Sequence, residues 1–216
     1  MTRPIHIHVE EPSMEAYIGE LLPRLALDAI CVRIINHGSK QILLREVPNR
    51  LRGYASIANE WRPLTLVLVD RDDDDCRALK NTLETAALAA GLATKTNEPN
   101  APFDVVNRIV IEELEAWHFG DPVSLRNEYP GLSENLANKA QYRNPDAIAG
   151  GTHEALFRVL QKAGYYRGLS HLPKVDTARR MARRVDVESN LSASFQHFLA
   201  GLRALAAQLN EVEPNG

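Results

Sequence analysis

Residues 64–75 read LTLVLVDRDDDD, an apolar run that stops in a group of acids. Its β-branched and leucine side chains predict a buried strand of a parallel sheet over 64–69. Adjacent carboxylates repel one another unless a cation lies among them, and grouped oxygen ligands suit Mg²⁺ or Mn²⁺. We therefore predict that Asp70 and Asp72 bind a metal ion, whereas Asp73 to Asp75 cap and begin the next helix. The alternative is a solvated loop before an acidic first helical turn.

Strands and helices alternate on both sides of this segment. Apolar runs predict further strands at 5–9, 30–35 and 105–111. This alternation is typical of an α/β fold with helices on both faces of a mostly parallel, here four-stranded, Rossmann-like sheet. Residues 1–120 are predicted to form this domain, and residues 121–216 a helical extension packed on it. Helical spacing predicts helices over 14–25, 42–51, 76–90, 112–119, 152–160, 174–185 and 192–209.

Local signals refine these helices. Pro23 should kink or end the first helix early, and Pro48 should interrupt the second, because proline lacks the amide proton that a helix interior uses. Ser13 and Thr152 directly precede helical patterns and are predicted to be N-caps. Cys31 lies in an apolar run and is expected to be buried.

The composition is that of an ordinary globular protein, with 216 residues, 44% hydrophobic and 25% charged. The net charge of −3 gives no overall attraction to nucleic acid. The charge is uneven, however, because residues 161–184 carry seven Lys or Arg against one acid, Asp176. The two cysteines fit neither a zinc site nor a disulfide framework, and no apolar run is long enough to cross a membrane. The N-terminal sequence MTRPIHIHVEE does not resemble a signal peptide, so we expect a cytoplasmic protein.

Three of the predicted strands end in acids. Glu10 and Glu11 follow the first, and further acids follow the third and the fourth. Parallel strands place their carboxyl ends on one edge of the sheet, where ligands bind in such folds. One or two Mg²⁺ ions held there would activate water and stabilise the oxygens of a phosphodiester. The predicted metal ligands are Glu10, Asp70, Asp72, Glu113 and Glu115.

Two lysines are candidates for contact with a phosphate. Lys40 follows the turn after the second strand and should lie on the same sheet edge, and Lys174 lies in the basic segment. A solvated surface position is the alternative for each. His6 and His8 alternate with apolar residues of the first strand and are expected on a partly exposed face.

Two motifs resemble the Toprim domain of topoisomerases, primases and overcoming-lysogenization-defect nucleases. VEEPSMEA (9–16) is similar to its strand-Glu-Gly-x-Ser/Thr-x-Glu motif, and VDRDDDD (69–75) to its Asp-x-Asp motif. The resemblance implies a Toprim-like fold in which Glu10 takes the place of the catalytic glutamate. Glu11 stands where the motif has glycine, so it is either a ligand itself or a mark of a changed substrate. The catalytic residues implied are Glu10, Asp70, Asp72 and Lys174, and the substrate-binding residues are Lys40, Ser13 and Glu11.

Nearly the whole chain resembles the bacterial family called domain of unknown function 4276. The similar stretches are EEPSMEA, RLRGYA, LVDRDDDDCRALK, NRIVIEELEAWHFGD and GGTHEALFRVLQKAGYY. The resemblance implies a metal-dependent nuclease that uses Mg²⁺ or Mn²⁺ and acts beside an ATPase in defence against phage or plasmids. A non-catalytic partner or regulatory subunit of an ATPase complex is the alternative. A phosphatase fits less well, because the Asp-x-Asp pair follows the third strand rather than the first. An EF-hand also fits poorly, since Asp75 stands where its loop needs glycine.

Overall fold

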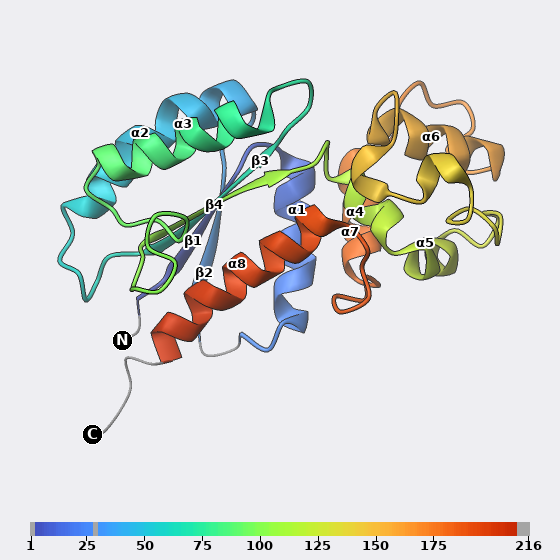
Figure 1. Ribbon diagram of the computed structural model, residues 1–216. Helices are drawn as coiled ribbons and strands as arrows, with labels where there is room; N and C mark the ends of the chain where they lie inside the picture. The colour runs from blue at the N-terminus through green and yellow to red at the C-terminus, as the bar shows by residue number, and fades with distance from the viewer. Residues whose placement is uncertain (1–2, 28–29, 211–216) are drawn as a thin grey trace.

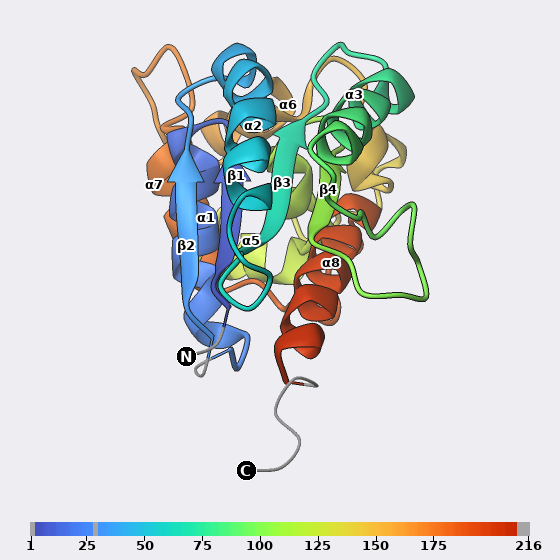
Figure 2. The ribbon, with the colours of Figure 1, turned by 90° about the vertical axis from the view of Figure 1, so that its left-hand side faces the viewer.

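The computed structural model describes residues 3–27 and 30–210 and contains one four-stranded sheet in the order β2-β1-β3-β4 (Figures 1 and 2). All three strand pairs are parallel, which confirms the predicted α/β class. The strands are β1 (Ile5–Val9), β2 (Val32–Asn36), β3 (Leu64–Asp70) and β4 (Val105–Val110). The second strand begins two residues later than expected. Cys31 therefore precedes it and is exposed, so its predicted burial is wrong.

The predicted helices are present over α1 (Pro12–Leu21), α2 (Lys40–Ala55), α3 (Cys76–Ala89), α4 (Glu115–Gly120), α6 (Thr152–Lys162), α7 (Lys174–Ala182) and α8 (Ala193–Asn210), and a further short helix is α5 (Pro122–Glu128). Three short 3₁₀ turns cover Leu22–Arg24, Ala140–Tyr142 and Pro145–Ala147. No described helix is long and apolar enough to cross a membrane.

The central strand β3 is buried on both faces, as its continuous apolar sequence predicts. Leu64, Leu66 and Leu68 join the core on one face, whereas Val67 and Val69 join a second core on the other. Helices α2 and α3 cover the valine face, and α1 and α8 cover the leucine face (Figures 1 and 2). The two-residue period of a strand thus divides the molecule into three layers.

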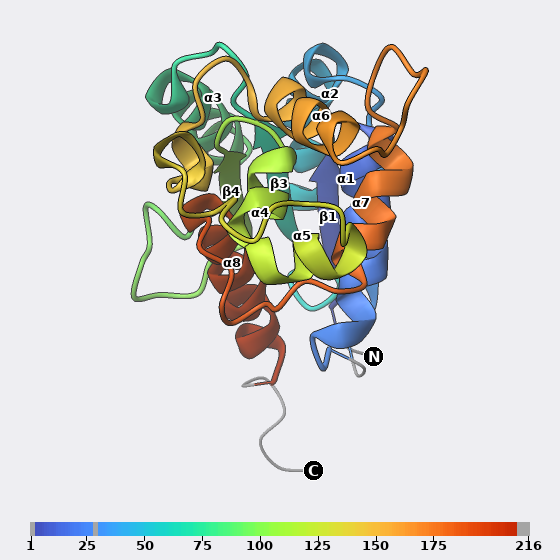
Figure 3. The ribbon, with the colours of Figure 1, turned by 90° about the vertical axis from the view of Figure 1, so that its right-hand side faces the viewer.

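The C-terminal half contributes directly to this core. Trp117 packs against Phe195 and Phe198 of α8, with ring centroids 5.1 Å apart in both pairs, and all three belong to the same cluster as Ile7 and Leu66. Helix α7 packs along α1, and α4, α5 and α6 lie together with it in Figure 3. This packing lays the beginnings of α6 and α7 against the carboxyl ends of the strands.

The prolines behave differently from each other. Helix α1 ends at Leu21 and a 3₁₀ turn that contains Pro23 follows it, as predicted. Helix α2, by contrast, continues through Pro48, so the predicted interruption is wrong. The buried residues Leu43, Val47 and Leu51 fix α2 on the sheet on both sides of the proline, and this burial offsets the lost hydrogen bond.

Two predicted caps are also wrong, and one is confirmed. Ser13 lies inside the first turn of α1, whose N-cap position is Glu11, and Thr152 is the first residue of α6, whose N-cap is Gly151 at φ 86°. Glycine adopts that left-handed conformation without the strain that a Cβ would add. Asp75 caps α3 as expected, because its carboxylate accepts a hydrogen bond of 2.7 Å from the Ala78 amide.

Candidate functional site

Three carboxylates from three elements are buried at the carboxyl edge of the sheet. Glu10 follows β1, Asp70 ends β3 and Glu115 begins α4, and their exposed fractions are 7%, 2% and 1%. Each has one oxygen without a hydrogen-bond partner among the described residues, namely Glu10 Oε2, Asp70 Oδ1 and Glu115 Oε2. Leaving a buried acceptor unsatisfied is costly, and more so when it is charged. With their acidic neighbours they form the carboxylate centre, which we define as Glu10, Glu11, Asp70, Asp72, Glu113 and Glu115.

The sheet itself brings these acids together. The parallel pairing sets His8 of β1 beside Val67 of β3, so the two strands reach their carboxyl ends side by side. The backbone amide of Asp70 donates a hydrogen bond to the Glu10 carboxylate. On the other side of β3, the Asp72 amide donates a hydrogen bond of 2.9 Å to the Glu112 carbonyl. This bond holds the segment after β4 at the same edge. Asp72 itself has φ 48°, a left-handed conformation that aspartate tolerates in a tight turn.

Burial and mutual repulsion favour the protonated forms of Asp70 and Glu10. Burial raises the pKa of Asp70 well above its usual range, and the charges of Glu10 and Glu11 raise it further. Burial likewise raises the pKa of Glu10 to about 7, although the nearby Lys40 ammonium opposes the shift. Asp70 and Glu10 therefore share a site where a second negative charge is unfavourable without a cation.

Glu115 is equally buried, yet the pKa of its carboxyl is lowered. Burial alone would raise this pKa, but a hydrogen bond from His153 and the charge of Lys174 outweigh that effect. His153 Nδ1 lies 3.4 Å from Glu115 Oε1, and this contact raises the pKa of the histidine. The carboxylate centre thus holds one stabilised anion, Glu115, beside Asp70, Glu10 and Glu113, whose pKa values burial raises.

Two lysines contact the outer acids of the carboxylate centre. Lys40 Nζ lies 2.5 Å from Asp72 Oδ2 and 2.9 Å from Asp74 Oδ2. It also donates a hydrogen bond of 3.1 Å to the Arg71 carbonyl. It begins α2 at the sheet edge where the sequence placed it. Lys174 begins α7, and its Nζ lies 3.7 Å from Glu11 Oε1 and 3.9 Å from Glu113 Oε1.

Both ammonium groups remain charged in this surrounding. Burial lowers the pKa of each, but the hydrogen bonds from Lys40 to Asp72 and Asp74, and the charges of Glu115 and Glu11 near Lys174, raise it by more. The lysines therefore supply fixed positive charge on two sides of the carboxylate centre rather than groups that exchange protons near pH 7.

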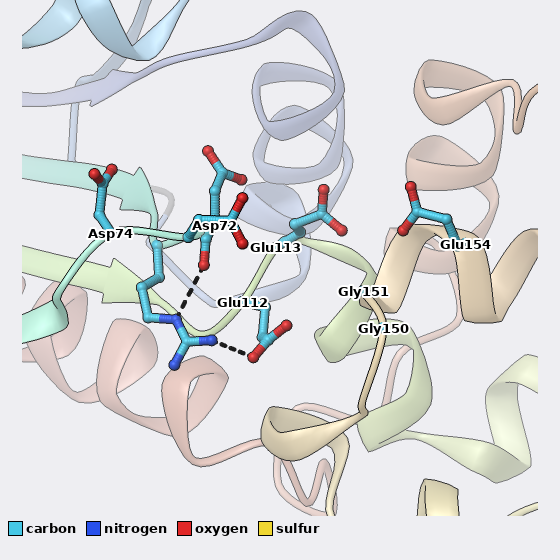
Figure 4. A pocket seen from close by; sticks show the side chains of 9 residues that line it. Asp72, Asp74, Glu112, Glu113, Gly150, Gly151 and Glu154 are labelled. Atoms are coloured by element: carbon cyan, nitrogen blue, oxygen red, sulfur yellow. Dashed lines mark hydrogen bonds and ion pairs between the residues drawn. The ribbon is translucent and has the colours of Figure 1, made fainter.

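A pocket of about 630 Å³ opens beside the carboxylate centre (Figure 4). Asp72 and Glu113 reach it from the ends of the strands, and Glu154 reaches it from α6, next to Gly150 and Gly151. Its full lining is Arg71, Asp72, Asp73, Asp74, Glu112, Glu113, Gly150, Gly151 and Glu154. Asp72 and Glu113, two members of the carboxylate centre, are therefore reachable from solvent on this side.

A family model supplies the one informative comparison with known proteins. Residues 9–203 match the model of a family described as "Domain of unknown function (DUF4276)". The chain belongs to this family. Comparisons with curated proteins and with solved structures found no significant match. Every residue of the carboxylate centre, together with Lys40 and Lys174, lies inside the range that matches DUF4276.

The structure assigns the remaining sequence candidates of this DUF4276 protein to supporting positions. Ser13 is 2% exposed and its hydroxyl donates a hydrogen bond to Glu11, so it orients that carboxylate rather than facing the pocket. Glu112 forms an ion pair with Arg71. Glu113 accepts a hydrogen bond of 3.0 Å from the His153 amide and so caps the beginning of α6.

The sequence reasoning did not identify His153 as part of the site. The residue lies in the stretch GGTHEA (150–155), and the glycine pair directly before a helical pattern was the available signal. Gly150 and Gly151 have φ values of 80° and 86° and turn the chain so that α6 begins against Glu113 and Glu115. That turn joins two segments far apart in sequence, which the local pattern alone does not show.

The donor set fits a hard divalent cation better than any other metal, because the unsatisfied atoms of Glu10, Asp70 and Glu115 are all carboxylate oxygens. Within residues 3–27 and 30–210, no three His, Cys, Asp or Glu side chains are placed closely enough to hold a metal without movement. Any coordination therefore requires these side chains to rotate toward one another, which would replace their repulsion by a shared attraction to the cation.

Proposed function

We propose that this DUF4276 protein is a phosphodiester hydrolase of the Toprim type, a nuclease that uses Mg²⁺ or Mn²⁺. One observation carries the proposal: Glu10, Asp70 and Glu115 converge on one edge of the sheet, and each has a buried oxygen without a partner. A protein that only needed these positions filled would be more stable with apolar side chains there. Retaining the carboxylates makes physical sense when a cation binds them.

The residues of the chain take distinct roles in this proposal. Glu10, Asp70 and Glu115 hold the cation, and Asp72 and Glu113 support it from the side of the pocket. When bound, the cation polarises the phosphate and lowers the pKa of a water molecule. Lys40 and Lys174, which contact the outer acids, orient the phosphate and offset the charge that develops on it.

The cellular setting is a further part of the proposal. The family resemblance implies that the protein works with an ATPase partner against phage or plasmid nucleic acid, and the N-terminal sequence led us to expect a cytoplasmic location. Affinity purification of the tagged chain from its native cells tests this, because an ATPase encoded nearby should co-purify in a fixed ratio.

A second candidate, a non-catalytic partner subunit, is favoured by the lysine contacts. Lys40 and Lys174 already compensate Asp72, Asp74, Glu11 and Glu113 within the protein, as structural ion pairs do. In this function the carboxylate centre fixes the fold of the sheet edge, and any metal only adds stability.

Hydrolysis measured with added metal decides between the two candidates. Purified protein is incubated with supercoiled plasmid and with labelled single strands in EDTA, Mg²⁺ or Mn²⁺, with and without a co-purified ATPase. The nuclease proposal expects metal-dependent cleavage that Glu10→Gln abolishes. The matched control is Glu134→Gln, because the Glu134 side chain is 84% exposed and lies outside the carboxylate centre. Metal-dependent thermal stabilisation without any turnover would instead establish the non-catalytic function.

A further inference from the structure

Two more pockets lie along α7, on the side of the carboxylate centre that Lys174 marks. The first, of about 660 Å³, is lined by His153, His171, Leu172, Pro173, Lys174, Val175, Asp176 and Arg179. The second, of about 580 Å³, is lined by Glu128, Asp176, Arg179, Arg180, Arg183 and Arg184. Because Asp176 and Arg179 line both, the two pockets join into one groove, which we call the α7 groove. Helix α7 begins near α6 and runs along α1 (Figure 3).

The α7 groove is connected to the carboxylate centre through shared residues. Lys174 lines the groove and also lies within 4 Å of Glu11 and Glu113, with distances of 3.7 and 3.9 Å. His153 lines the groove and contacts Glu115 at 3.4 Å. A molecule that lies in the groove therefore meets Lys174 and His153, the two residues that also contact acids of the carboxylate centre.

The charge of the groove is positive overall. Lys174 and four arginines face three carboxylates, those of Asp176, Glu128 and Glu20, with which three of the arginines pair. Arg180 and Arg184 share Glu128, and Arg180 also pairs with Asp176. Arg179 is exposed between the two pockets. A row of guanidinium groups matches a row of phosphates, since each fork can bind two oxygens.

We propose that the α7 groove binds one strand of nucleic acid and guides it into the carboxylate centre. This inference rests on the proposed hydrolase function and names its substrate as a strand rather than a small phosphate ester. The nine residues of α7 span about 13 Å. This length accommodates only a few phosphates of an extended strand.

The lining of the groove favours a single strand over a duplex. Beside Lys174 the wall carries the apolar residues Leu172, Pro173 and Val175 and the rings of His153 and His171. Unpaired bases stack on rings and apolar surface, whereas a duplex presents only its phosphates to such a wall. Cations for the backbone and apolar contacts for the bases thus lie in one groove, as single-strand binding requires.

The test removes two arginines that the fold does not need. Arg179 is exposed. Among the described residues the Arg183 side chain, 62% exposed, pairs with Glu20 alone, so R179A/R183A should fold normally. Binding of a fluorescent dT12 and of its RNA equivalent is followed by anisotropy in Ca²⁺ at several salt concentrations. The control is Arg45→Ala, because the Arg45 side chain is 71% exposed on α2, across the sheet from α7.

If two phosphate contacts are lost, the salt slope of log K falls by about 1.4, and affinity at 0.1 M salt falls roughly 25-fold. The R179A/R183A variant should keep its turnover of bis-p-nitrophenyl phosphate with Mn²⁺, because this small diester does not extend along α7. Equal oligonucleotide binding by the wild type, R45A and R179A/R183A overturns the α7 groove as the strand path while leaving the hydrolase proposal standing. A duplex that binds more tightly than dT12 also overturns it. No turnover of either substrate by the wild type overturns the proposed function, and the inference with it.

Discussion

Two clusters of buried polar side chains differ in how well their atoms are satisfied. The carboxylate centre leaves oxygens of Glu10, Asp70 and Glu115 without partners. The second cluster, the histidine chain, lies between β1 and α2 and forms a continuous series of contacts. Tyr54 Oη lies 3.0 Å from His6 Nδ1 and 3.2 Å from His8 Nε2. The other ring nitrogen of His8, Nδ1, lies 2.9 Å from His37 Nε2, and His37 Nδ1 lies 3.2 Å from Glu46 Oε2.

The difference between the clusters separates a structural role from a functional one. Each histidine of the chain stays neutral because burial lowers its pKa, and neighbours supply its hydrogen bonds. The histidine chain therefore needs no ligand from outside the protein to supply its hydrogen bonds. In the proposed function, by contrast, a bound cation completes the carboxylate centre. A buried polar cluster with unsatisfied atoms is the better indicator of a ligand site.

The largest expected effect comes from replacing Asp70, the most repelled acid. Asp70→Asn keeps the shape but removes the charge, so metal-dependent hydrolysis should fall by about 10²–10³-fold. The apoprotein should become more stable by about 1–3 kcal/mol at pH 8, because an uncompensated buried charge is lost. Nuclease assays and urea unfolding measure the two effects. If Asp70→Asn lost both stability and activity, Asp70 would have a structural role like that of the histidine chain.

The pH dependence of metal binding should follow next in size. Glu10, with a pKa raised to about 7 by burial, must release its proton before it binds a cation. Mn²⁺ affinity should therefore weaken as pH falls below 7, by up to about tenfold per pH unit for each ligand carboxyl that must release its proton. Calorimetric titrations between pH 5.5 and 8.5 measure this, and Glu10→Gln should flatten the profile. A wild-type affinity that is constant across this range would exclude Glu10 as a ligand.

The sequence predicted the carboxylate centre better than the histidine chain, for a physical reason. Acids at the ends of parallel strands share an edge whatever the details of packing, so Glu10, Asp70 and Glu115 could be grouped before the structure was known. The fate of His6 and His8 depends on which helix covers their face. We expected that face to be partly exposed, but Tyr54 of α2 closes over it and His8 is fully buried. The prediction was therefore wrong for His8.

The helical segments show the same limit. The spacing of apolar residues that predicts α2 and α8 is a local property of the sequence, and both helices are present. The site role of His153 depends on a turn at Gly150 and Gly151 that brings α6 against α4, and no local period encodes that contact. Contacts between distant segments that depend on how a particular turn packs, as at His153, are therefore what sequence reasoning missed at the site.

Acid should destabilise the protein through the histidine chain. Burial lowers the pKa of His8 to about 3 and also lowers that of His37, so as pH falls below 6.5 the unfolded chain takes up protons before the folded one does. The free energy of unfolding should then drop by up to about 1.4 kcal/mol per pH unit for each histidine. Glu10, whose pKa is raised, acts in the opposite direction between pH 7 and 4.5. In Glu10→Gln the loss of stability between pH 6.5 and 5 should therefore be steeper than in the wild type, as urea unfolding at each pH will measure. If stability falls with pH equally steeply in Glu10→Gln and in the wild type, Glu10 does not contribute to the pH dependence of stability.

The smallest expected effect distinguishes the acids within residues 70–75. Asp75 is satisfied in the way the histidine chain is, because its carboxylate accepts the Ala78 amide at 2.7 Å. Asp75→Ala should therefore cost about 1 kcal/mol of stability through the lost N-cap. It should leave metal affinity unchanged, since Asp75 does not line the pocket beside the carboxylate centre. Urea unfolding and Mn²⁺ titration of Asp75→Ala and Asp70→Asn in parallel should give opposite signs for stability. If both variants change stability in the same direction, the presence or absence of hydrogen-bond partners does not distinguish structural acids from functional ones in this protein.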